Sequence, residues 1–529
     1  MIKKLLKHWP IFLLVILTFI LRIIKLEELF YFTYDESIPA FVARRLILWQ
    51  HIPLIGGVTP FNFHLGPYFY WFYTLILYPA KLNPIGWGYA SAAIATITTY
   101  LIYLVGKNFA SRKVGFTAAT FWTFSYLANV YDRHLWALYW GPLVSTLTIF
   151  SLYKITKGHH KFVYLLGATI GLSIHADPSN LVLLFLSLVV WYIYGLPIKK
   201  STLIAVFFVV FSFLPLLIFD LRHNFANSKP VVDFWKQGAN VPGFNLERFG
   251  ENSLFFPQAF SRLIYTFGDN EIAKQYSYCQ TYVTEKLKAV PLVIVSLFLF
   301  AIVSFIIWSI RINKREPGWH FVGLLIVLYF IGIQLYGTIF RADIFEHYIT
   351  GTFVIFLLIF AKIVSLLPKK LWLIALAFFV LANLYKLSKA TNSLGLSYKR
   401  EAIQFTMQQV QDKPFSLDSL STCWKLNGYR YLFTVFGREP VKSYVDPNFA
   451  YLYGTTLVAE KHPPTVVAFI VHDFKPENND FYQRYALLKS HEVKAALFGN
   501  IEVVIMDNST SWFDKPQTLK NPNVSAGQD

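Results

Sequence analysis

The chain has 529 residues, of which 55% are hydrophobic and only 15% are charged. Several apolar runs reach the roughly 18 residues that a helix needs to cross a bilayer, which excludes an ordinary soluble globular protein and predicts a polytopic α-helical membrane protein. The formal net charge is +18, but residues 388–529 are close to charge balance, so the excess lies in short loops between apolar runs. This positive-inside distribution argues against nucleic acid as a partner and indicates a bilayer.

Residues 1–7 contain three lysines and precede the first apolar run, residues 11–24. Because no small-residue cleavage site follows the run, we expect this segment to be an uncleaved membrane anchor. We expect the protein to lie in the cytoplasmic (inner) membrane, with its N-terminus in the cytoplasm. Basic loops then mark the inner ends of about 11 predicted spans. These spans cover residues 10–25, 86–105, 114–130, 138–153, 162–175, 180–196, 202–219, 290–310, 319–339, 348–367 and 371–387.

One further apolar run, residues 69–79, is too short to be a span. As a helix it would measure about 16 Å, roughly half of a bilayer core. If it crossed, every later basic loop would lie outside. We therefore predict an interfacial or re-entrant helix within an outer loop that covers residues 26–85.

That outer loop contains Asp35 and Glu36, two adjacent acids that are costly to place in lipid. Their position at the membrane surface makes them candidate catalytic carboxylates. The alternative is helix capping, with Asp35 as the N-cap of the helical stretch that follows. His64, in the segment FNFHLGPYFYWFY, is a candidate substrate-binding residue, although an interfacial aromatic belt also explains the aromatic residues around it.

Two later outer loops also hold candidate residues. Asp132, Arg133 and His134 are consecutive after the third predicted span, where a local ion pair is the alternative reading. The segment FRADIFEHYITG supplies Arg341, His347 and Tyr348, which either bind a lipid phosphate or form an ordinary charged loop. His175 and Asp177 are two possible metal ligands, too few for a site, and no nucleotide-binding or zinc-protease motif is present.

The chain loses its long apolar runs after residue 390, so we predict a membrane domain, 1–390, and a small extracytoplasmic α/β domain, 391–512. Residues 401–410 are expected to form a helix, and 464–474 and 501–507 to form strands. The polar tail, 513–529, is predicted to be disordered. Cys279 and Cys423 are both expected outside, where they either pair or remain two free thiols.

A short basic N-terminus and a single span are followed by YDE, PLIGGVTP and HLGPYFYWFY before the second span. This pattern resembles the GT-C membrane glycosyltransferases, in particular the branch of protein O-mannosyltransferases and aminoarabinose transferases, often described as the dolichyl-phosphate-mannose-protein mannosyltransferase family. Within the last segment Pro67, Tyr70 and Trp71 coincide with the aromatic family motif, whereas Gly66 stands where the family has its first proline. The resemblance covers roughly residues 1–390.

This resemblance implies an inverting transfer of a sugar from a polyprenyl-phosphate donor to a lipid, glycan or protein acceptor on the outer face of the membrane. It implies Asp35 as the base, assisted by Glu36, and Asp132 as a further acid. It implies Arg133, His134, Arg341 and His347 as candidates to bind the donor phosphate. A divalent cation is possible in this class. The alternatives are a ligase or polymerase of lipid-linked glycans, a transporter or flippase, and a membrane-anchored binding protein.

Overall fold

A computed structural model describes residues 9–59, 61–134, 136–236, 243–268, 270–272, 290–312, 315–342, 344–421, 428–454, 458–472 and 479–515. Within these ranges the side chains of Tyr34, Asp35, Leu138, Phe234, Trp235 and Asn448 are not described. The predictions for Cys279, Cys423 and most of the tail therefore lie outside the described residues.

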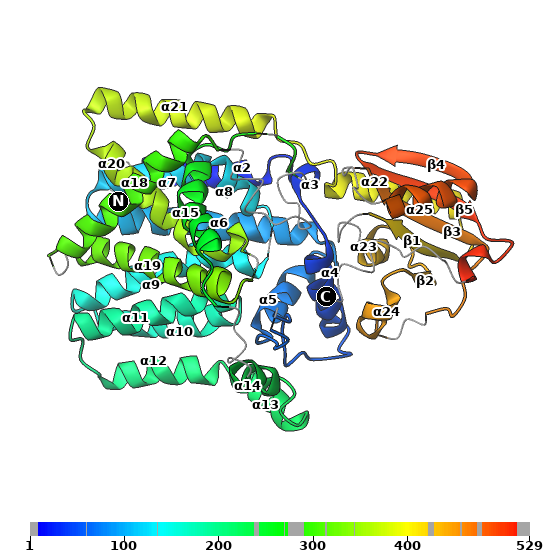
Figure 1. The fold of residues 1–529 in the computed structure, drawn as a ribbon, viewed down its shortest axis with the longest axis horizontal. Coiled ribbons are helices and arrows are strands. Elements are labelled where there is room, and N and C mark those ends of the chain that lie inside the picture. The colour runs from blue at the N-terminus through cyan, green and yellow to red at the C-terminus, as the bar shows by residue number, and fades with distance from the viewer. Residues whose placement is uncertain are drawn as a thin grey trace.

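Each predicted span coincides with one helix or with two consecutive helical segments of a bundle (Figure 1). In chain order these are α2 (Trp9–Ile23), α6 (Ile85–Phe109), α7 (Arg112–Phe124) with α8 (Tyr126–Tyr131), α9 (Gly141–Thr156), α10 (Phe162–Ile174), η2 (Pro178–Asn180) with α11 (Leu181–Ile193), α12 (Lys200–Phe211) with α13 (Leu214–Arg222), α18 (Leu292–Ile312), α19 (Pro317–Ile333) with η5 (Gln334–Ile339), η6 (Glu346–Thr352) with α20 (Phe353–Ser365), and α21 (Lys369–Ser388).

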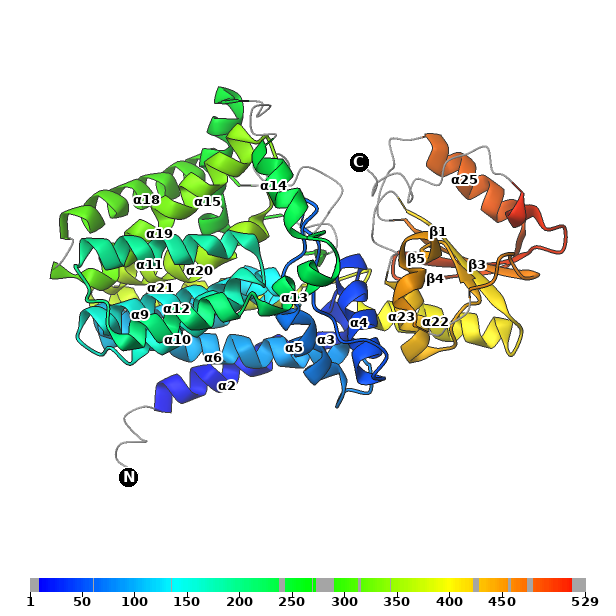
Figure 2. The same cartoon turned by 90° about the horizontal axis from the view of Figure 1, so that it is seen from below.

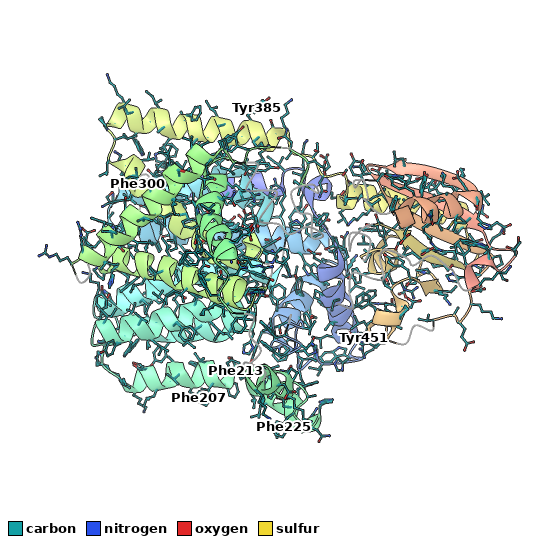
Figure 3. All side chains as sticks on the ribbon, viewed as in Figure 1. Phe207, Phe213, Phe225, Phe300, Tyr385 and Tyr451 are labelled. Atoms are coloured by element: carbon teal, nitrogen blue, oxygen red, sulfur yellow. The ribbon has the colours of Figure 1, made fainter. Side chains whose placement is uncertain are left out.

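The described part of the chain contains six helices long and apolar enough to cross a membrane. Large apolar side chains cover the outside of the bundle, as Figure 3 shows for Phe207 and Phe300. These two side chains are 59% and 73% exposed, which only a lipid environment makes favourable for so many apolar groups. The predicted polytopic membrane protein is confirmed.

Two long connections between bundle helices, named the first and second outer loops after their predicted side of the membrane, are themselves folded. The first contains α3 (Leu26–Leu29), α4 (Tyr34–Ile47) and α5 (Tyr68–Leu77), and α5 corresponds to the short apolar run. The second lies between the predicted spans 202–219 and 290–310 and contains α14 (Ser228–Lys236) and α15 (Leu246–Ile264), two helices that the sequence analysis did not predict. The α15 helix is largely buried against the bundle, where Phe260 stacks on Phe356 with ring centroids 4.8 Å apart.

The C-terminal domain is a five-stranded sheet with helices on both faces (Figure 2). The strands are β1 (Phe415–Leu420), β2 (Lys442–Ser443), β3 (Thr465–Val471), β4 (Glu492–Phe498) and β5 (Ile501–Asp507), and their order is β2-β1-β3-β5-β4. The pairs β1–β2 and β1–β3 are parallel, whereas β5 pairs antiparallel with both neighbours. The remaining elements are α22 (Leu396–Val410), α23 (Tyr429–Phe436), α24 (Asp446–Phe449), η8 (Ala450–Leu452), α25 (Asn479–Ser490) and η9 (Trp512–Asp514).

Alternation along the strands gives this sheet two apolar faces. Val467 and Phe469 face α22 and α23, whereas Val466 and Ala468 face α25. The first face is not closed within the domain, because it continues into a core shared with α3, α4 and α5. The predicted strands 464–474 and 501–507 are confirmed as β3 and β5, and β1, β2 and β4 were missed.

Direct bonds join the C-terminal domain to the first outer loop. The backbone N–H of Leu396 donates to the Phe30 carbonyl at 3.1 Å, and the Tyr431 hydroxyl donates to the Leu82 carbonyl at 2.7 Å. Arg44 in α4 forms an ion pair of 2.8 Å with Glu439. The chain therefore passes from the helical bundle to the sheet domain near residue 390, but the hydrophobic core of the sheet domain continues into the first outer loop.

Candidate active site

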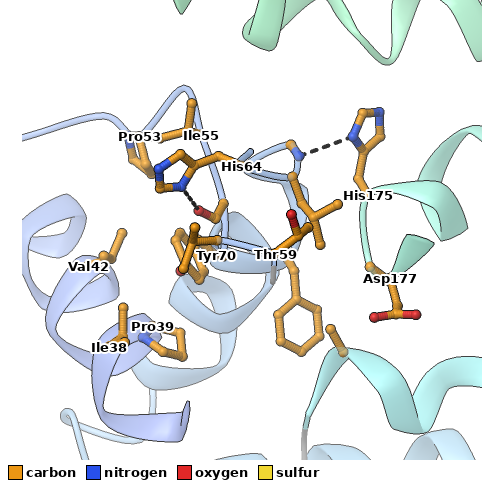
Figure 4. Close-up of a pocket in the computed structure, with 18 of the residues that line it drawn as sticks. Ile38, Pro39, Val42, Pro53, Ile55, Thr59, His64, Tyr70, His175 and Asp177 are labelled. Carbon is orange, nitrogen blue, oxygen red and sulfur yellow. Dashed lines mark hydrogen bonds between the residues drawn. The ribbon is translucent and has the colours of Figure 1, made fainter. Parts of the chain in front are cut away.

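A cavity of about 920 Å³ lies where the helical bundle, the first outer loop and the C-terminal domain meet. Its wall combines one face of α4, the loop 51–66 with the start of α5, the loop 175–178, residues 345–348 and residues 449–452. Figure 4 shows the α4 side chains Ile38, Pro39 and Val42 on one side, with His175 and Asp177 on the other. The size fits a cofactor- or substrate-sized ligand.

The helix that forms one wall begins with a capping box. Thr33 is the N-cap, and its backbone N–H and hydroxyl both donate to one carboxylate oxygen of Glu36, at 2.8 and 2.7 Å. The T-x-x-E spacing satisfies donors that the first turn leaves unpaired. The alternative reading with Asp35 as N-cap is therefore wrong, and Glu36 is the residue that stabilises the helix start.

Glu36 is buried and faces inward, away from the cavity lining. Its second carboxylate oxygen lies 3.7 Å from Nδ1 of His134. Burial acts to raise the pKa of Glu36, but the His134 interaction and the two hydrogen bonds from Thr33 outweigh it and hold that pKa below its ordinary value. A carboxylate held ionised by internal partners is suited to fixing the helix.

The side chain of Asp35 is not among those described, but its place in α4 is informative. Ile38, Pro39 and Val42 follow it by three, four and seven positions, and all three line the cavity. Residues with these spacings share one face of a helix. The backbone thus places position 35 on the cavity-facing side of α4, whereas Glu36 lies on the buried side.

Asp132 and Arg133 have partners in the bundle and do not line the cavity. Asp132 accepts hydrogen bonds from Arg22, which also donates to the carbonyls of Thr123 and Trp122 at the end of α7. Arg133 donates to the carbonyls of Asn129 and Leu21, both at 2.7 Å. These arginines satisfy carbonyls at helix C-termini, so this cluster fixes how α2, α7 and α8 meet.

His134 completes the same cluster. Its ring stacks on Phe30 at 5.9 Å, and its carbonyl accepts a hydrogen bond from Ser91 Oγ at 2.9 Å. Since its Nδ1 faces Glu36, His134 connects the start of α4 to the bundle.

Four histidines line the cavity, His51 and His64 from the first outer loop and His175 and His347 from later segments. Nδ1 of His64 lies 3.1 Å from the Gly56 carbonyl, which accepts its proton. His347 lies between Trp136 and Phe345, with ring centroids 4.7 and 5.3 Å away.

His175 is held as one neutral tautomer. Its Nδ1 accepts the Gly66 N–H at 3.1 Å, so Nδ1 is unprotonated, and Nε2–H donates to Ser212 Oγ at 3.0 Å (Figure 4 shows the first bond). A Cβ on Gly66 would lie 2.4 Å from Nδ1 of His175. The bond and the close contact together explain the glycine at position 66, since a proline there would have neither the N–H nor the space.

Asp177 lines the cavity beside His175, and it was noticed in the sequence only as a weak metal ligand. One of its oxygens accepts the Ser179 N–H at 2.8 Å. Burial raises the pKa of Asp177 to about 6, against which the bonds from Ser179 act. A carboxylate with a pKa near neutrality in a cavity is a candidate acid or base.

The segment before α20 divides into cavity and bundle contacts. His347 and Tyr348 line the cavity, while Glu346 is buried in an ion pair with Arg262 of α15 and accepts the Tyr131 hydroxyl at 2.9 Å. Arg341 is exposed, and its carbonyl accepts a hydrogen bond from Arg248. Arg341 is not part of the lining.

Several lining residues had not been singled out. Arg45 and His51 follow the acids in the first loop, where their basic character was the available signal. Phe449, Tyr451 and Leu452 come from the C-terminal domain, and nothing local in the sequence links them to the cavity. In the described part of the chain, no three His, Cys, Asp or Glu side chains are grouped to hold a metal ion.

The helical bundle, its two folded loops and the C-terminal sheet define a polytopic membrane protein with a C-terminal sheet domain, and this architecture has a counterpart among solved structures. ArnT from Cupriavidus metallidurans bound to undecaprenyl phosphate superposes with a TM-score of 0.58 and 10% sequence identity, over 96% of this chain and 100% of that chain. At this identity the comparison establishes the fold alone.

Weaker similarities have TM-scores too low for a structural conclusion. The apo structure of the same ArnT has a TM-score of 0.49 and 13% identity, covering 97% of this chain and 99% of that one. An oligosaccharyltransferase from Archaeoglobus fulgidus, in complex with zinc and sulfate, has a TM-score of 0.47 and 10% identity, covering 87% of this chain and 67% of that one. No family model and no curated protein sequence matches the chain.

Proposed function

We propose that this protein is a membrane glycosyltransferase that moves a sugar from a polyprenyl-phosphate donor to an acceptor hydroxyl on the outer face of the cytoplasmic membrane. The observation that carries this proposal is the cavity itself. It lies at one end of an apolar bundle and combines an apolar wall with Arg45 and four histidines. A lipid-linked sugar phosphate requires an apolar path, cationic groups and a base in one place.

The chemistry needs few groups. The acceptor oxygen attacks the anomeric carbon, the bond from that carbon to the phosphate oxygen breaks, and the phosphate leaves with the electron pair. Because phosphate is a good leaving group, the essential protein group is a base that takes the acceptor proton. Direct displacement without a covalent intermediate inverts the anomeric centre. Asp35 is our candidate for the base, supported by the position of residue 35 on the cavity face of α4.

Two carboxylates compete for the role of base, and substitution separates them. We expect Asp35→Asn to lower transfer of sugar from a polyprenyl phosphate by about 100-fold or more in proteoliposomes, with unchanged stability. Glu36→Gln is the matched control, because its amide oxygen can still accept from Thr33, and it should retain most of the activity. Wild-type turnover in Asp35→Asn with loss of turnover in Asp177→Asn would transfer the role to Asp177.

The orientation of the protein is part of the proposal. Trp49 is 83% exposed and follows α4, so a cysteine at this position is accessible to reagents. In a variant without Cys279 and Cys423, Trp49→Cys should react with an impermeant maleimide added outside intact cells. Labelling only after permeabilisation would place the cavity on the cytoplasmic side and overturn the proposed topology.

A transporter is the alternative from another class. Transporters usually hold ionisable groups at mid-membrane on broken helices. Here Asp35 lies in α4, outside the bundle helices, and Asp177 lies in the loop after α10 and lines the cavity. Uptake or flipping of the lipid-linked sugar without formation of a glycosylated product would favour the transporter.

A further inference from the structure

Arg45 occupies the far end of the α4 wall from Asp35, three positions after Val42. The two positions are ten residues apart, which corresponds to about 15 Å along a helix. Side chains of a helix lean toward its N-terminus, so the Arg45 side chain leans toward the position of Asp35. The distance between the two positions leaves room for the donor phosphate near Arg45, the acceptor oxygen near Asp35 and the anomeric carbon between them.

The C-terminal domain holds the guanidinium of Arg45. Nη1 donates to the backbone carbonyl of Tyr451 at 3.0 Å. Nε of the same residue is shielded from solvent and has no hydrogen-bond partner among the described residues. An unpaired buried donor is costly, and an anionic oxygen from a ligand would satisfy it.

The charge around the cavity favours an anion near Arg45. The acidic residue among the described lining side chains is Asp177, which lies across the cavity from Ile38 and Val42 (Figure 4). His51 lines the same end of the cavity as Arg45. Burial and, secondarily, the positive charge of Arg45 lower the pKa of His51, so the neutral imidazole is favoured there and Arg45 supplies the positive charge.

A neighbouring groove indicates where an apolar tail would leave. This groove, of about 500 Å³, shares His51 and Ile55 with the cavity and reaches Trp49, Phe219 and Arg222. Phe219 and Arg222 belong to α13, at the end of a segment long and apolar enough to cross a membrane. An anion at Arg45 would therefore have a direct exit for a lipid tail to the apolar surface of the bundle.

We propose that Arg45, held by the carbonyl of Tyr451, binds the phosphate of the polyprenyl donor, so that the C-terminal domain completes the donor site. This inference rests on the proposed function and deepens it. Arg133 and His134 are engaged within the bundle, which leaves Arg45 as the arginine that, among the described residues, lines the cavity and has a donor without a hydrogen-bond partner.

Binding to the full-length protein in lipid nanodiscs tests the inference, with undecaprenyl phosphate, undecaprenol and inorganic phosphate as probes. Wild type should bind undecaprenyl phosphate much more tightly than undecaprenol. Arg45→Gln should raise the Kd for the phosphate at least tenfold, the loss expected for a charge-assisted hydrogen bond, and leave that for undecaprenol unchanged. Millimolar inorganic phosphate should not displace the lipid, and displacement would overturn the lipid assignment.

Arg44→Gln is the matched control, because Arg44 pairs with Glu439 and does not line the cavity. It should stay within twofold of wild type. If Arg45→Gln does not fold, Arg45→Lys decides, since it keeps the charge but loses the planar fork and should still weaken binding severalfold. Equal binding by folded wild type and Arg45 variants would refute the inference alone. Equal binding of undecaprenyl phosphate and undecaprenol by wild type would refute the proposed function as well.

Discussion

Arg22 donates two hydrogen bonds to one carboxylate oxygen of Asp132, from Nε at 3.0 Å and from Nη2 at 2.9 Å. Both residues are buried, and they are separated by 110 positions in the chain. The pair joins the first helix of the bundle to the end of α8. Asp132 is thereby committed to a partner within the bundle, so we expect its loss to affect stability before chemistry.

Removing one partner of this ion pair leaves the other buried and uncompensated. We expect Asp132→Asn to destabilise the protein by about 3–5 kcal/mol, seen as a lower apparent Tm in detergent. Turnover per folded molecule should remain close to wild type. Normal stability with abolished transfer would instead return Asp132 to the catalytic residues.

The Glu346–Arg262 pair is a second buried link, between the segment beside the cavity and α15. Glu346→Gln should cost about 3–5 kcal/mol, because Arg262 loses its charge partner. The double variant Glu346→Leu with Arg262→Met removes both charges and should recover part of the loss. The apparent Tm of the two variants checks this, and a double variant less stable than Glu346→Gln would contradict it.

Asp177 is expected to make stability depend on pH. Its pKa of about 6 in the folded protein exceeds the ordinary value of an aspartate, so ionisation costs more in the folded state than in the unfolded one. Stability contributed by the protonated form is present at low pH and is lost as pH rises from about 4 to about 6.

Asp177→Asn should therefore raise the free energy of unfolding at pH 7.5 by about 1–3 kcal/mol, because asparagine keeps an oxygen for the Ser179 N–H without the charge. The gain should vanish at pH 4. Thermal unfolding of both proteins across this range measures the difference, and a gain independent of pH would show that the raised pKa is not its cause.

Lys399 anchors the C-terminal domain to the first outer loop. This buried ammonium donates to the Phe32 carbonyl and lies 5.2 Å from the centroid of the Tyr31 ring. Lys399→Met leaves that carbonyl unpaired and should cost about 1–3 kcal/mol. Lys389→Met, at an exposed position of the same connection, is the control and should be neutral. Faster proteolytic release of the C-terminal domain in Lys399→Met alone checks the prediction.

The membrane helices were predictable because crossing a bilayer depends on local composition. A helix satisfies its own backbone, so an apolar run of sufficient length needs no partner to specify it. The short run that became α5 was recognised for the same reason. The start of α4 was also readable, since Thr33 and Glu36 have the T-x-x-E spacing of a capping box. That spacing was overlooked in favour of Asp35.

The helix α15 and the strand β4 were missed for different reasons. Polar residues interrupt the apolar pattern of α15, so its sequence does not read as a buried helix. The helix is nevertheless buried, because polar side chains such as Arg262 have partners within the protein. The strand β4 is partly exposed and lacks strict alternation, so pairing with β5 defines it.

Length, charge distribution and apolar periodicity in the amino-acid sequence were enough to predict the polytopic architecture and the folded first outer loop. Only the tertiary structure separated the roles of the candidates. It directs Asp132, Arg133 and His134 into bundle contacts, and it brings Arg45, His175 and Tyr451 to one cavity. The physical reason is that ion pairs and cavity walls join residues hundreds of positions apart, and no local pattern encodes which distant partner a charged side chain will meet.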